Sequence, residues 1–174
     1  MTHRALLVLG LIFTVSTTLR AQGRPVEHLS ATARADSAAV LAARSTFQWV
    51  EAALKAGGLA RRDTTVECEN MPSEATITLY RDSAGVVRQL KWEGGSEDQH
   101  VTTTYYYDGS RRLRFAFREQ AAVNGTLFEE RVYYNDGGNV ARRLRKLVRG
   151  PGWGSKPVEP AHDPVDWVRR FCEN

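Results

Sequence analysis

Basic side chains are concentrated in one part of this chain, between Arg111 and Arg149. The stretch holds ten basic residues against four acidic ones, whereas residues 93–109 carry four acids and no lysine or arginine. Guanidinium groups bind phosphate and sulfate through paired hydrogen bonds and stack on aromatic rings. We therefore expect an anion-binding face on a strand, with these candidate binding residues: Arg112, Arg114, Arg118, Arg131, Tyr106 and Tyr133. Lipid phosphates or an acidic extracellular polymer would suit such a face.

A solvated surface is the alternative interpretation of the same arginines. An antiparallel sheet with one buried face needs a polar face, and long arginine stems cover neighbouring apolar surface. Glu119, Glu129 and Glu130 are close enough in sequence to pair with the arginines. Edge strands also use charges to discourage aggregation.

Residues with other chemistry are sparse. Three histidines follow residue 21: His28, His100 and His162. They do not have the spacing of metal ligands on a predicted helix. Residues 94–98, Gly-Gly-Ser-Glu-Asp, are not a nucleophile elbow. Two groups of polar residues could hold a metal or act as an acid-base pair. Glu93, Glu97 and Asp98 are better explained as a solvated turn than as a calcium site. In the second group, His162, Asp163 and Asp166, Asp163 is better explained as a helix cap. We predict no metal, no cofactor and no catalytic residue.

The first 21 residues predict a secretory signal peptide. A basic start precedes an apolar run of 11 residues, Ala5 to Val15, which is too short to span a bilayer, and Ala21 is a plausible cleavage point. An uncleaved N-terminal anchor is the alternative. Cleavage leaves 22 basic residues against 20 acidic ones, so the charge of residues 22–174 gives little support for a nucleic-acid partner. We expect a periplasmic or secreted protein with no membrane span after cleavage.

The two cysteines, Cys68 and Cys172, agree with export. An even number of cysteines outside the cytosol favours a disulfide. The bond would close a loop of about 100 residues. The restriction of the unfolded chain by such a loop stabilises the folded state by at most about 4.7 kcal/mol. No CxxC pair accompanies them, so a zinc site is disfavoured.

Residues 22–174 predict one α+β domain. Helical spacing of Val40, Ala43, Phe47, Val50 and Leu54 indicates an amphipathic helix at residues 30–56, ended by Gly57-Gly58 and packed on the sheet that follows. Alternating apolar residues then predict an antiparallel meander of about six or seven strands over residues 74–148, in which residues 140–148 fit a strand or a helix. After a loop, Asp163-Pro164 predicts the cap of a short C-terminal helix carrying Trp167, Val168 and Phe171.

Side-chain alternation also predicts strand faces and turns. Leu113, Phe115 and Phe117 should face one way, and Arg112, Arg114 and Arg118 the other. Residues 94–98 should connect two strands, and Asn124-Gly125 should form a two-residue type I′ hairpin.

Three aromatic strand ends run into Asp/Gly turns and begin 27 residues apart, at Tyr80, Tyr107 and Tyr134. A fixed period indicates one hairpin unit used three times. The stretch from Ile77 to Leu147 resembles the β-hairpin repeats of MORN-like variant proteins of the exported bacterial type. It departs from their pattern in lacking a repeated Gly-x-Trp. The resemblance implies an interaction or scaffold role by analogy.

Three functions remain open from the residues. The first is an exported, non-enzymatic binding or envelope-scaffold protein that acts through a sheet face, toward an anionic envelope component or a protein partner. The second is a small disulfide-tied inhibitor of an extracytoplasmic hydrolase, which presents residues 94–100 and 150–156. The third is a small hydrolase with a pocket lined by His100 or His162 and two acids.

Overall fold

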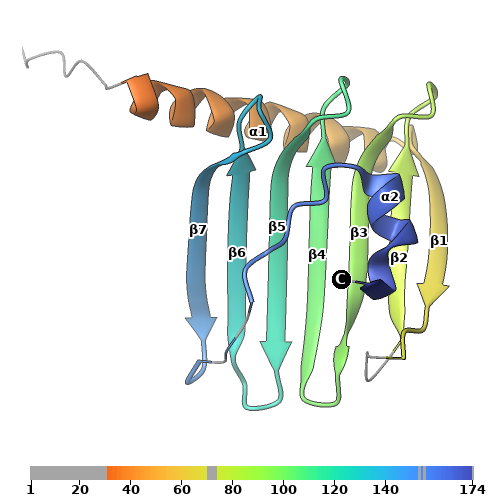
Figure 1. Ribbon diagram of the computed structural model, residues 1–174, viewed down its shortest axis with the longest axis vertical. Helices are drawn as coiled ribbons and strands as arrows, with labels where there is room; N and C mark the ends of the chain where they lie inside the picture. Colours follow the sequence, from red (N-terminus) through yellow and green to blue (C-terminus); the bar gives the residue numbers. More distant parts are fainter. Residues whose placement is uncertain (1–30, 70–73, 153, 155, 174) are drawn as a thin grey trace, which may run out of the picture.

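The computed structural model describes residues 31–69, 74–152, 154 and 156–173, which form one long helix, one sheet and a short C-terminal helix (Figure 1). The predicted signal peptide lies outside the described residues. The elements in chain order are α1 Ala31–Lys55, β1 Ala60–Val66, β2 Ala75–Arg81, β3 Val87–Ser96, β4 Gln99–Tyr107, β5 Leu113–Ala122, β6 Leu127–Tyr134, β7 Val140–Arg149, α2 Pro164–Arg169 and the 3₁₀ turn Phe171–Glu173. The predicted α+β class is confirmed.

The helix α1 crosses one face of the sheet near the end of the strands (Figure 1). It contacts β4, β5, β6 and β7. Ala43 and Val50, from the predicted apolar stripe, are buried against the sheet. The helix ends where Gly57 adopts a φ of 69° and donates to the carbonyl of Leu54, a backbone conformation that glycine adopts without a steric penalty.

All seven strands form one antiparallel sheet, in which chain order is also spatial order. Residues 140–148, which fitted a strand or a helix and were placed in the meander because a hairpin turn precedes them, lie in strand β7, which extends to Arg149. β1 was not predicted, because Ala-Arg-Arg-Asp-Thr-Thr-Val has no apolar alternation; pairing with β2 defines it, and Cys68 therefore follows the first strand. β3 extends to Ser96, so the predicted connection at residues 94–98 is shorter than expected.

Three connections at the α1 end of the sheet share one hydrogen-bond pattern. Each starts at an Asp or Asn whose side-chain oxygen accepts the amide four residues further on, as Asp82, Asp108 and Asn135 do. Such side-chain turns replace a backbone acceptor. The fourth residue has positive φ: Gly85, Arg111 and Gly138. At the other end, Gly125 has positive φ but Asn124 does not, so the type I′ prediction is wrong.

Both faces of the sheet are covered, by different parts of the chain. Under α1 lies a cluster that includes Tyr106 and Phe115. The opposite face packs against the C-terminal segment, and its cluster includes Tyr107 and Leu113. Leu113 therefore lies on the face opposite Phe115, contrary to the prediction. The reason is a shift in the β4–β5 register between Tyr106 and Tyr107, because one extra residue reverses side-chain alternation.

The C-terminal segment crosses the sheet as an extended strap, defined here as residues 156–163 (Figure 1). Side chains of the sheet donate hydrogen bonds to its backbone carbonyls: Tyr105 to Glu159 at 2.9 Å, Tyr107 to Ala161 at 2.5 Å, Arg118 to Lys156 at 2.6 Å and Arg143 to Val158 at 3.4 Å. These bonds compensate the backbone groups of a segment that has no ladder of its own.

The predicted short C-terminal helix is present as α2, but it ends at Arg169, so Trp167 and Val168 lie on it and Phe171 lies in the 3₁₀ turn that follows. The side chain of Asp163 accepts the amides of Val165 and Asp166, and Pro164 is the first helical residue. A disulfide joins Cys68 to Cys172 with 5.2 Å between the Cα atoms, which confirms the predicted bond. No helix in the described part of the chain has the length and apolar content needed to span a bilayer.

Candidate functional site

A hollow lies between α1 and strands β5 and β6, and we take it as the centre of the candidate site. Its volume is about 300 Å³, and it is lined by Ala43, Arg44, Phe47, Phe115, Phe117, Arg131 and Tyr133. A second hollow of about 510 Å³ continues along the helix toward β7, lined by Asp36, Ser37, Val40, Leu41, Arg44 and Arg142. Arg44 lines both, so we treat the two as one helix–sheet groove.

Aromatic rings form the floor of the groove. Phe47 lies 5.2 Å from Tyr106 and 6.1 Å from Phe115, measured between ring centroids. Phe115 in turn lies 5.2 Å from Tyr133. Phe47 still exposes 40% of its surface, and Leu41 of the second hollow exposes 62%. An apolar floor of this kind favours an apolar group of a ligand, because covering it removes that area from water.

Three arginines from three elements surround this floor. Arg131 lies over the ring of Phe117, 5.2 Å from its centroid, and pairs with Glu129 at 2.7 Å. Arg44 and Arg142 make no ion pair or hydrogen bond with the described residues. Two guanidinium groups are therefore available to an anion beside an apolar surface, where charge-assisted hydrogen bonds are strong.

Tyr106, another predicted site residue, is buried beside the groove rather than in it. It exposes 6% of its surface and donates a hydrogen bond to the carboxylate of Glu51 on α1 at 3.0 Å. Burial, followed by the charge of Glu51, raises its pKa well above the usual range. The hydroxyl therefore stays protonated and ties β4 to the helix.

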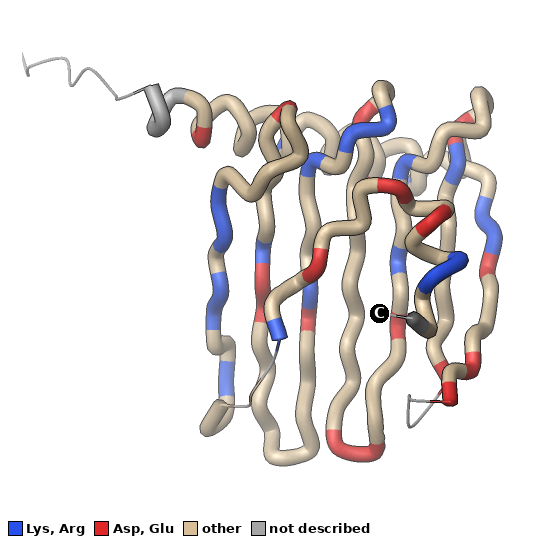
Figure 2. Tube along the Cα trace, in the orientation of Figure 1, with Lys and Arg blue, Asp and Glu red and all other residues tan. Residues whose placement is uncertain are grey.

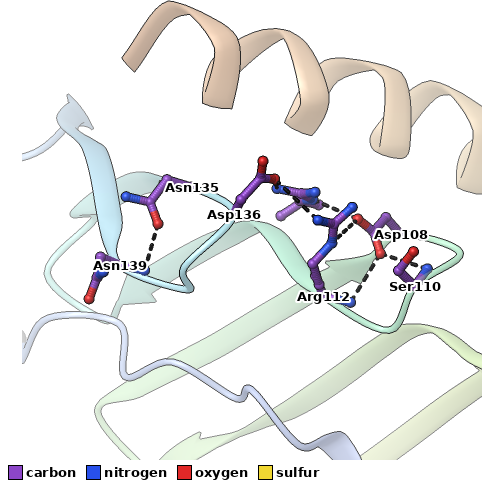
Figure 3. A network of polar contacts seen from close by, with 7 residues as sticks. Asp108, Ser110, Arg112, Asn135, Asp136 and Asn139 are labelled. Carbon is purple, nitrogen blue, oxygen red and sulfur yellow. Dashed lines mark hydrogen bonds and ion pairs between the residues drawn. The ribbon is translucent and has the colours of Figure 1, made fainter. Parts of the chain in front are cut away.

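Arg112 and Arg114 lie in a polar network at the α1 end of the sheet, in which Figure 3 labels Arg112, Asp108 and Asp136. Both pair with Asp108, at 3.0 and 2.7 Å, and both reach Asp136 of the β6–β7 turn. Arg114 exposes only 4% of its surface. Burial alone would raise the pKa of Asp108, but the amide of Arg112 and the guanidinium of Arg114 lower it below its usual value. This network joins two turns and leaves Arg114 little surface for a ligand.

Arg118 lies on the other face of the sheet, under the strap. It donates a hydrogen bond to the carbonyl of Lys156, and burial lowers its pKa. Both properties fit a residue that holds the strap. The register places Phe117 opposite Arg131 and Arg118 opposite Glu130. Arg131 and Arg118 therefore point to opposite faces, and the expected single row of arginines is wrong. Of the six candidate residues, the groove contains Arg131 and Tyr133; whether any of the six binds a ligand stays a prediction.

Three acids of the other candidate groups, Glu93, Asp163 and Asp166, have local partners. Glu93 pairs with Lys91 at 2.9 Å, Asp163 caps α2, and Asp166 pairs with Arg169 and Arg170. A hollow of about 700 Å³ includes His100 and several acids, but the ring of His100 contacts Thr102, and no described carboxylate is bonded to it. The described residues contain no cluster of histidine, cysteine and acidic side chains that could hold a metal ion.

Sequence reasoning missed Arg44, Leu41 and Arg142 of the groove. The first two lie on the predicted helix next to its apolar stripe, and their exposure depends on where the helix crosses the sheet. Arg142 is in the stretch that fitted a strand or a helix equally well. An arginine adjoining an apolar helix stripe was the available signal for Arg44.

Comparison with known proteins finds no matching family model, no matching curated protein and no matching solved structure. The resemblance to MORN-like variant hairpin repeats therefore stays a prediction.

Proposed function

We propose that this protein is an exported, non-enzymatic binding protein that takes an anionic amphiphile of the cell envelope into the helix–sheet groove. The observation that carries the proposal is the position of Arg44, an arginine without a bonded partner among the described residues that lines both an aromatic hollow and the hollow beside Leu41. A ligand with a phosphate or carboxylate head and an apolar chain would satisfy both surfaces at once.

Charge and apolar surface support this ligand better than a plain polyanion. The acids Asp36 and Glu129 lie close to the groove and offset part of the positive charge, so electrostatic attraction alone would be weak. Covering exposed apolar side chains contributes roughly 25 cal/mol for each Å² removed from water and does not depend on charge. The hairpin-repeat resemblance implies an interaction role by analogy, in agreement with the proposal. The disulfide between Cys68 and Cys172 is compatible with export.

Binding of the purified protein to four probes tests the proposal: lipopolysaccharide, vesicles containing phosphatidylglycerol, vesicles of phosphatidylcholine alone, and heparin. We expect binding to one or both anionic amphiphiles, weak binding to heparin and none to phosphatidylcholine. Salt should weaken the binding without abolishing it, because screening acts on the ionic part alone. Binding to lipopolysaccharide but not to phosphatidylglycerol vesicles would identify an outer-leaflet lipid as the ligand. Equal or stronger binding to heparin, or no binding to either amphiphile, would refute the proposal.

A further inference from the structure

The outer edge of β7 is a second surface, separate from the groove. β7 is the last strand of the sheet, and among the described residues it pairs on one side only, with β6. It is ten residues long, and every side chain except Ala141 is exposed. The free side of such a strand presents backbone N–H and C=O groups that can pair with another extended chain.

The side chains of β7 are basic and apolar. Figure 2 shows basic positions along the strand and no acidic ones. The basic residues are Arg142, Arg143, Arg145, Lys146 and Arg149. Between and beside them, four large apolar side chains are exposed by 39% to 44%: Val140, Leu144, Leu147 and Val148. Charges alone would discourage pairing, but a long edge that also exposes apolar side chains is suited to a strand of opposite charge.

The pairing of β6 with β7 indicates what such a strand would contain. In that register Glu129 lies opposite Lys146 and Glu130 opposite Arg145. Glu130 forms an ion pair with Arg143 of β7 at 2.7 Å, so the resident neighbour places an acid in contact with a base of β7. A second copy of this chain does not offer this. Its β7 would place bases against bases, and its other edge strand, β1, carries Arg61 and Arg62 with one acid, Asp63.

We propose that the free edge of β7 adds an extended, acid-rich segment of a partner protein as a further strand. Backbone hydrogen bonds would hold the segment. Acidic side chains opposite Lys146 and Arg149, and apolar ones opposite Leu144, Leu147 and Val148, would select it. The groove binds through side chains of one face and the edge through the backbone. Arg142 belongs to both surfaces, so the charge of the edge is tested at Arg149, which does not line the groove, and the two proposals can fail independently.

Hydrogen exchange measured amide by amide tests strand addition. The probe is a synthetic peptide in which glutamate alternates with valine, and the control peptide has lysine in place of glutamate. The β7 amides that do not face β6 should exchange about tenfold more slowly at a peptide concentration about ten times its dissociation constant. The amides of β1, the opposite edge of the same sheet, should not change.

A pair of matched variants tests the charge selection. Arg149 and Arg62 are both exposed arginines on edge strands, opposite Leu127 and Leu79 respectively. Arg149→Glu should lower the affinity for the acidic peptide by about two- to tenfold, and Arg62→Glu should leave that affinity unchanged. Strand addition at β7 would be overturned by binding without slowed β7 amides, by equal slowing at both edges, by equal binding of the lysine peptide, or by no binding at all.

Discussion

The guanidinium of Arg131 and the ring of Phe117 face each other across the β5–β6 register, 5.2 Å apart, on the α1 side of the sheet. The ring of Phe117 and the aliphatic stem of Arg131 thus form an apolar surface, and the guanidinium places a positive charge next to it. Glu129 holds this guanidinium at 2.7 Å. The arrangement places Arg131 beside the apolar floor that Phe47 and Tyr133 complete.

Replacing Leu41 by serine should separate ligand binding from stability. Leu41 is 62% exposed, so the free energy of unfolding should change by less than about 0.5 kcal/mol. The affinity for lipopolysaccharide or anionic vesicles should fall by roughly three- to tenfold, because the variant loses apolar surface worth about 1 kcal/mol when covered. Parallel denaturant titration and vesicle binding measure the two effects. An unchanged affinity would show that the second hollow does not contact the ligand.

Asp108→Asn should destabilise the protein in a pH-dependent manner. The variant keeps an oxygen that can accept the turn amides, as Asn135 does in its own turn, but loses the charge that pairs with Arg112 and Arg114. At neutral pH the free energy of unfolding should fall by about 1–3 kcal/mol.

The pH dependence follows from the lowered pKa of Asp108 in the folded state. A carboxylate with a lowered folded pKa stabilises the fold above the pKa of the unfolded chain, about 3.9, and this stability is lost as the pH falls through the folded pKa. The difference between wild type and Asp108→Asn should therefore shrink below about pH 4. Denaturant titrations at several pH values measure it, and a difference that does not depend on pH would assign the loss to the turn instead of the charge.

Local signals in the sequence predicted most of the fold. The spacing from Val40 to Leu54 defined α1, the order Asp163-Pro164 defined the start of α2, and alternating residues defined the strands from Ile77 onward. These features depend on residues that are close in sequence. β1 could not be found in this way, because its exposed, mostly polar residues become a strand through pairing with β2.

The faces of the arginines depend on relationships that no local pattern contains. The irregular register beside Tyr106 and Tyr107 reverses the alternation near Leu113. The groove likewise requires α1 to cross β5, β6 and β7, which brings Arg44 close to residues almost a hundred positions later in the chain. Sequence reasoning therefore identified two groove residues, Arg131 and Tyr133, without the helix residues that complete the site.

Tyr107→Phe should measure how strongly the strap is held. The Tyr107 hydroxyl is buried and donates to the carbonyl of Ala161, which is also buried. Its removal leaves that carbonyl without this donor, so the free energy of unfolding should fall by about 1–2 kcal/mol. Tyr133→Phe is the matched control, because the Tyr133 hydroxyl bonds to no described residue. Equal stabilities of the two variants in chemical denaturation would contradict this role of Tyr107.

Replacing both Cys68 and Cys172 by serine should lower the free energy of unfolding by about 2–5 kcal/mol, because the bond restricts the unfolded chain. Thermal unfolding of the oxidised protein and the double variant measures this loss. Thiol labelling of the unfolded, unreduced protein is the independent check. Two reactive thiols there would show that the bond does not form.

Under the proposed function, the groove binds an anionic amphiphile through Arg44, Arg131 and Arg142. The most direct measurement is the affinity of the triple variant Arg44→Gln, Arg131→Gln and Arg142→Gln for lipopolysaccharide and for phosphatidylglycerol vesicles, beside Arg62→Gln as a control from an exposed site on β1. We predict that the triple variant loses at least about tenfold in affinity for the preferred amphiphile and has a shallower salt dependence, and that Arg62→Gln binds as the wild type does. A triple variant that folds and binds with wild-type affinity and wild-type salt dependence would contradict binding of the amphiphile in this groove.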